Sequence, residues 1–161
     1  MKTIDVLKQS LWNQFGASID MLRNAIVMWP DDKWETHSKV FYMAHHTLFF
    51  LDYYLTNPPS GFEPRFASVE DDTPDKIYSK KDLIEYLSDC RSKCRHVIDN
   101  ITDENIEERW TEEQRNRSFV MIELLMYNMR HVQHHAAQIN MMLRNEIDNA
   151  PRWVSRALKE S

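Results

Sequence analysis

Glycine, proline and cysteine are all scarce in this chain. Its 161 residues include two glycines, six prolines and two cysteines. A β-sandwich or barrel needs many more turn residues, and no convincing alternation of apolar and polar residues is evident. Two thiols do not make a disulfide framework, so a reducing compartment is the simpler setting. The composition, rich in Leu, Met, Glu, Lys, Arg and Asn, favours an all-α fold.

Long apolar runs and basic blocks are missing as well. No stretch of roughly 18 apolar residues exists, so no membrane-spanning helix is expected. The N-terminal residues do not have the pattern of a signal peptide. The formal net charge is −5, and no run of about five basic residues occurs, which argues against a nucleic-acid surface. We therefore expect one cytoplasmic domain over residues 1–161, without a nucleic-acid or membrane partner.

Apolar residues at steps of three and four predict long amphipathic helices. The expected helices cover about residues 3–28, 38–55, 80–98 and 118–144, with a possible short one at 152–158. Their starts carry polar residues of the types that cap helices. The expected caps are Thr3 for the first helix, Thr36 or Ser38 for the second, and Ser79 with Asp82 for the third.

The connection over residues 57–78 is long for a compact domain. It holds four prolines and the acidic run from Glu70 to Asp72. A segment of this length can return the chain to the other end of a bundle, so the second and third helices are expected to run parallel. The second helix is apolar on nearly all sides. Either other segments of the chain cover it or a second subunit does.

The predicted fourth helix carries an anomaly on its apolar face. Advancing about 100° per residue places His131, His135, Gln138 and Asn128 on the stripe that also holds Leu124. Buried polar groups are costly unless they find partners, so four together need a reason. Histidines at i and i+4 offer two imidazoles to one metal ion. Gln138 and Asn128, one turn on either side, are candidates to hydrogen-bond the rings.

A third imidazole is available in the middle of the second helix, at His45-His46. His46 shares a face with Tyr42, Phe50 and Tyr53, whereas His45 is rotated by about 100°. Two explanations without a metal remain open for the histidines: a polar layer that holds water and a pH-sensing cluster.

The other candidate residues have simpler interpretations. His134 is expected at the edge of the histidine stripe, in contact with the ligands rather than the ion. His37 is expected to be solvated or to cap a helix. Cys90 and Cys94 share a helix face and are expected to be buried, inert thiols.

Two segments, YMAHHTLFFLDYYL over Tyr42–Leu55 and MRHVQHHAAQIN over Met129–Asn140, resemble the DinB/YfiT-like family. The layout of helices and the long crossover are similar over nearly the whole chain. The resemblance implies an up-down-down-up four-helix bundle, often a dimer. It also implies a three-histidine site for zinc, nickel or another divalent ion. Carried over by motif, the ligands are His46, His131 and His135.

The second motif departs from the family at one point. Many members have His-Arg-Gly-Gln there, where this chain has His135-Ala136-Ala137-Gln138. The departure leaves the ligands in place and removes any role of the arginine.

Three neutral imidazoles leave a coordination position open, which is typical of a catalytic site. The resemblance implies a metal-dependent hydrolase, or a transferase of a low-molecular-weight thiol such as bacillithiol, mycothiol or glutathione, with a small-molecule substrate. Tyr42, Tyr53, Gln138 and His134 are candidates to orient water or substrate. No general base lies on the histidine stripe. A non-enzymatic dimeric bundle with a structural or sensing metal is therefore the alternative.

Overall fold

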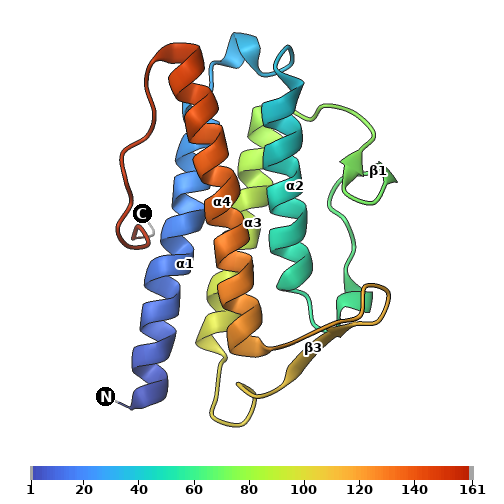
Figure 1. The fold of residues 1–161 in the computed structure, drawn as a ribbon, viewed down its shortest axis with the longest axis vertical. Coiled ribbons are helices and arrows are strands. Elements are labelled where there is room, and N and C mark those ends of the chain that lie inside the picture. Colours follow the sequence, from blue (N-terminus) through green and yellow to red (C-terminus); the bar gives the residue numbers. More distant parts are fainter. Residues whose placement is uncertain (1, 160–161) are drawn as a thin grey trace.

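The computed structural model describes residues 2–159 and is mostly helical, with four long α-helices side by side (Figure 1). The helices are α1 (Thr3–Met28), α2 (Ser38–Tyr54), α3 (Lys80–Asp99) and α4 (Met121–Ile147). The prediction of a mostly helical chain with four long helices is confirmed. None of the described helices is long and apolar enough to cross a bilayer.

Contacts at the helix ends show that α1 and α3 run in opposite directions. Lys80, at the start of α3, donates to the carbonyl oxygen of Trp29 at the end of α1, at 2.7 Å. At the other end, Lys8 of α1 donates to the carbonyl oxygen of Ile101 just after α3, at 3.1 Å. Helix α4 packs against both α1 and α2.

Helices α2 and α3 run in the same direction. Just before them, the indole N–H of Trp34 donates to the carbonyl oxygen of Tyr78 at 2.9 Å. Further along, the Lys93 ammonium donates to the Asp52 carboxylate at 2.6 Å. The connection between α2 and α3 therefore crosses the length of the bundle. It contains the short 3-10 helix η2 (Pro59–Gly61) and a small hairpin of β1 (Ser68–Glu70) and β2 (Thr73–Pro74).

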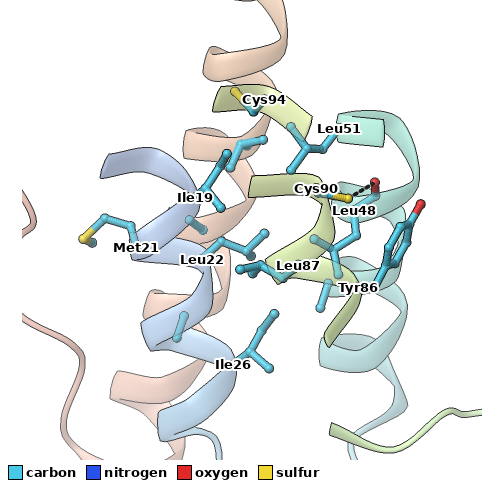
Figure 2. Close-up of a cluster of buried hydrophobic side chains, with 14 of the residues drawn as sticks. Ile19, Met21, Leu22, Ile26, Leu48, Leu51, Tyr86, Leu87, Cys90 and Cys94 are labelled. Atoms are coloured by element: carbon cyan, nitrogen blue, oxygen red, sulfur yellow. Dashed lines mark hydrogen bonds between the residues drawn. The ribbon is translucent and has the colours of Figure 1, made fainter. Parts of the chain in front are cut away.

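Aliphatic side chains from different helices fill the interior (Figure 2). Leu22 of α1, Leu48 of α2 and Leu87 of α3 are all fully buried there. Burying one such side chain contributes about 1.5–3 kcal/mol. Cys90 and Cys94 are buried free thiols in the same layer, as predicted, and burial raises the pKa of each.

The start of α4 was predicted wrongly. Residues 117–120 form strand β4 (Arg117–Val120), which pairs antiparallel with β3 (Arg109–Glu112), and α4 begins only at Met121. Alternate residues of β3, Trp110 and Glu112, are buried. The alternation covers only four residues in each strand, which is too short to stand out from the helical pattern beside it.

The short helix considered possible at residues 152–158 does not form. This segment instead lies along α1, where the N–H of Ala157 donates to the carbonyl oxygen of Asn13 at 2.9 Å. The N–H of Leu158 donates to the Asp20 carboxylate at 2.8 Å. Backbone groups that bond another element cannot also form the i to i−4 bonds of a helix.

The predicted caps had mixed outcomes. Ser79 and Asp82 form the expected capping box at the start of α3. Lys2 rather than Thr3 precedes α1, and His37 rather than Thr36 or Ser38 precedes α2. His37 makes no side-chain capping bond and instead lies 3.1 Å from a carboxylate oxygen of Glu146.

Other segments of the chain cover much of the apolar surface of α2. The ring of Phe62, from the crossover, packs edge-on against Phe49 and Tyr53, with ring centroids 5.0 and 5.2 Å apart. Trp110, from β3, packs against Tyr53 on the same side, at 5.5 Å. Of the two explanations for this apolar helix, coverage within the chain accounts for this part of its surface.

Candidate metal centre

Three histidines converge where α2 faces α4. His46 comes from α2, and His131 and His135 lie one turn apart on α4. One ring nitrogen of each lies within 4.8 Å of the other two. Nε2 of His131 and Nε2 of His46 are 3.2 Å apart. Helical spacing places His131 and His135 together on α4. The antiparallel packing of α2 on α4 then brings His46 beside them.

The donor set and its spacing fit a divalent ion. Metal–nitrogen bonds of about 2.0–2.1 Å in tetrahedral geometry place two ligand nitrogens about 3.4 Å apart. The 3.2 Å separation between His131 and His46 is close to that value. Nδ1 of His135 lies 2.7 Å from Gln138 Oε1, to which it donates, and this bond leaves the ring's Nε2 available for an ion.

The crossover supplies a carboxylate at this site. Asp72, in the turn between β1 and β2, places Oδ2 2.5 Å from Nδ1 of His46. A carboxylate in this position fixes the tautomer of a ligand histidine and raises its basicity. The sequence showed only an acidic run from Glu70 to Asp72. Nothing local indicated which of its side chains turns toward a helix 26 residues away.

The environment favours the neutral, metal-binding form of two of the rings. Burial, followed by the proximity of His135 and His46, lowers the pKa of His131 to about 3. Burial also lowers the pKa of His135, opposed by its hydrogen bond to Gln138. Metal binding requires neutral imidazoles, so at neutral pH these two need not release a proton.

Two of the residues expected to support the ligands lie beside them. Gln138 makes the hydrogen bond to His135 described above. His134 is exposed and its ring centroid lies 5.0 Å from that of His135, at the edge of the site.

Two other residues expected near the ligands bond elsewhere, and a third is exposed. Asn128 is fully buried and donates to the backbone carbonyl of Leu51 at 3.0 Å, so it joins α4 to α2 rather than to a histidine ring. The Tyr53 hydroxyl donates to Glu112 at 2.7 Å. Tyr42 is exposed.

His45, the neighbour of His46, lies on a different side of α2 and does not join the site. It is buried between the rings of Phe41 and Phe66, with centroids 6.1 and 5.8 Å away. Burial lowers the pKa of His45 as well. The 100° rotation between adjacent helical residues therefore separates the two histidines into different environments.

A cavity of about 320 Å³ opens beside the three histidines. This volume is at the small end of ligand sites, which run from about 300 to 1,000 Å³. Within residues 2–159, its walls contain no carboxylate. The remaining lining residues are Phe50, Tyr54, Arg115, Arg117, Tyr127 and His134. Sequence reasoning missed the two arginines because it did not predict the β3–β4 hairpin that carries them.

The fold and the site define a helical bundle that presents three histidines to an open cavity. The sequence profile of the DinB superfamily matches residues 14–139, a span that contains all three histidines. The chain belongs to the DinB superfamily, which confirms the family resemblance drawn from the two histidine segments. A search of curated proteins found no match.

Proposed function

We propose that this protein is a metal-dependent enzyme that holds one divalent ion, zinc or nickel, through His46, His131 and His135. The observation that carries the proposal is the convergence of three imidazole nitrogens beside an open cavity. Three protein ligands leave a coordination position for a reactant, whereas structural sites are closed by four. We also propose that the helices carrying this site form a bundle of up-down-down-up topology, which the contacts at the helix ends support.

The reaction that fits this site is hydrolysis or the transfer of a small thiol to an electrophile. The ion would supply Lewis acidity to activate the nucleophile. Asp72 holds the proton on Nδ1 of His46 and keeps its Nε2 directed at the site. Phe50 and Tyr54 form an apolar wall that limits the water around a bound reactant. His134, exposed at the edge of the cavity, is placed to contact a bound reactant.

One observation favours a second candidate, in which the ion has a structural role. His46 is hydrogen-bonded to Asp72 in the crossover, so an ion on His46 would also fasten the β1–β2 hairpin to the bundle. Metal binding would then stabilise the fold whether or not it supports turnover, because any ligand of the folded state alone does so.

Both candidate functions require an ion bound at the three histidines, and the metal content of the protein tests this requirement. The protein is purified without a histidine tag and its metal per chain is measured. We expect about one ion per chain in the wild type, a value near zero in His135→Ala, and an unchanged value in His134→Ala. His134 is the matched control because it is the adjacent histidine on the same helix. Metal near zero in the wild type, or content unaffected by His135→Ala, would overturn the proposal.

Turnover separates the two candidates. Thiol consumption is followed with a panel of electrophiles, and hydrolysis with a panel of activated esters and amides, each with and without chelator. Chelator-sensitive turnover in either panel supports the enzyme. A chelator that lowers the melting temperature while no reaction is detected in either panel supports the structural role.

A further inference from the structure

The cavity beside the histidines is cationic in a chain that is acidic overall. The formal net charge of the protein is −5, yet two arginines and no carboxylate line the cavity in the part of the chain that the structure describes. Arg117 belongs to β4, and Arg115 to the turn that precedes it. The hairpin therefore places positive charge next to a site that is itself a candidate for a divalent cation.

Arg117 has donor groups to spare. Its Nη1 donates to the hydroxyl of Tyr54, a neutral partner, at 3.0 Å. Across the strand pair it faces Glu112, but that carboxylate accepts from Tyr53 at 2.7 Å and lies 3.4 Å from Arg115. Over residues 2–159 no carboxylate lies within ion-pair distance of Arg117. A guanidinium has five N–H groups, so one bond to a tyrosine leaves most of them for a ligand.

Each arginine is separated from the histidines by one aromatic ring. The guanidinium of Arg115 lies 5.8 Å from the centre of the Phe50 ring. The Phe50 ring in turn packs 4.9 Å from His46 and 5.8 Å from His131, centre to centre. The arginines and the three histidines line the same cavity, so a small molecule bound there can contact an arginine and the histidine site together.

Tyr54 fixes the position of Arg117. Its ring lies 6.5 Å from that of His131 and 5.3 Å from that of Tyr127, centre to centre. Burial, together with a hydrogen bond to Tyr127, raises the pKa of Tyr54. The hydroxyl therefore stays neutral and holds Arg117 without cancelling its charge.

We propose that Arg117, assisted by Arg115, binds a carboxylate or phosphate group of the substrate whose reacting part lies at the three histidines. This inference rests on the proposed function, because it names the substrate class of the same site. The substrate is a small anion, since the cavity measures about 320 Å³. Arginine suits this role because its planar fork binds carboxylate or phosphate through two parallel hydrogen bonds.

The test measures anion binding apart from turnover. Succinate, inorganic phosphate and neutral succinamide are titrated calorimetrically into the chelator-treated protein and into the zinc-loaded protein. Succinate and phosphate separate the two anionic groups. The proposal expects at least one of them to bind and succinamide not to bind. It expects Arg117→Gln to weaken that binding about tenfold or more, the usual effect of losing a charge-assisted bond.

Arg109→Gln is the matched control. Arg109 lies on the same hairpin, is exposed, and bonds to Ser118 rather than facing the cavity. The variant loses the same charge and is expected to bind the anion as the wild type does. Equal binding by the wild type and Arg117→Gln, equal weakening in both variants, or no anion binding in either metal state would overturn the inference. These outcomes leave the metal content unaffected, so failure of the anion site and failure of the metal site are distinguishable.

Discussion

His46 and Asp72 form the hydrogen bond that joins the metal site to the crossover, with Nδ1 and Oδ2 2.5 Å apart. The bond connects α2 to the turn between β1 and β2, so the candidate ligand is oriented by a segment outside the helices. The imidazole has two nitrogens with separate tasks. Nδ1 is held by the carboxylate, and Nε2 faces His131.

The first prediction concerns Asp72→Asn. The substitution keeps the shape of the side chain and removes the charge of the group that orients His46. We expect metal affinity to fall about 10- to 100-fold, the range seen when partners of ligand histidines are removed. Competition with a chromophoric chelator measures it. Asp71→Asn is the control, because Asp71 is the adjacent acidic residue and is exposed, and its positive φ of 40° is tolerated by asparagine. Equal affinity in both variants would contradict the role of Asp72.

The second prediction concerns the acid sensitivity of the metal-free protein. The pKa of His131 is about 3 in the folded chain, against 6.5 for a histidine in water. Below about pH 6.5 the unfolded chain takes up a proton that the folded chain refuses, so the free energy of unfolding falls as the pH drops toward 3. Above pH 6.5 both states are neutral and this contribution to the pH dependence vanishes.

Urea unfolding of the chelated protein at several pH values between 7 and 4 measures the effect. His131→Gln lacks the imidazole that takes up this proton, so its free energy of unfolding is expected to fall less steeply as the pH drops. The difference in slope corresponds to at most about one proton taken up on unfolding. His96→Gln, at an exposed position in α3, is expected to retain the wild-type slope. A His131→Gln slope equal to that of the wild type would refute the assignment.

Local pattern explains what the sequence could predict of the fold and the site. The repeat of three and four residues predicts α1 and α3 to within one residue at each end, because apolar residues at that spacing face the other helices. The same periodicity brought His131 and His135 onto one stripe. The family motif, rather than the periodicity, favoured His46 over its neighbour.

The remaining parts of the site depend on contacts that no local pattern encodes. Asp72 reaches His46 across 26 residues, and its direction depends on a turn of the β1–β2 hairpin. Arg117 reaches the cavity because β3 and β4 pair, and strands of four residues leave little periodicity to read. The possible helix at 152–158 does not form because backbone N–H groups of this segment donate to acceptors on α1 instead.

The third prediction concerns Cys90 and Cys94. Both are buried, and burial raises the pKa of each thiol, so the reactive thiolate is strongly disfavoured in the folded chain. We expect a disulfide reagent such as DTNB to label neither thiol in the native protein and both in guanidinium chloride. The released chromophore counts the reactive thiols in each state. Rapid labelling of the native protein would contradict the burial of these thiols in a closed helix core.

The last prediction concerns Gly16, which lies on α1 beneath the C-terminal segment. A Cβ added there would lie 2.5 Å from the Cβ of Ala157, too close for two carbon atoms. Two effects oppose each other in Gly16→Ala. Alanine favours the helix by about 1 kcal/mol over glycine, whereas overpacking of this kind costs about 1–3 kcal/mol. We expect the clash to prevail and to be relieved by movement of residues 154–158 away from α1.

Amide hydrogen exchange detects that movement directly. The N–H of Ala157 donates to the carbonyl oxygen of Asn13, so its exchange in Gly16→Ala should accelerate at least about tenfold, since the bond protecting it is lost. Gly61→Ala is the matched control, because a Cβ there meets no atom within 4 Å. It should leave the exchange of Ala157 unchanged. If Gly16→Ala stabilises the protein and leaves that amide protected, the segment accommodates the methyl group and the close packing of Gly16 against Ala157 does not hold the C-terminal segment in place.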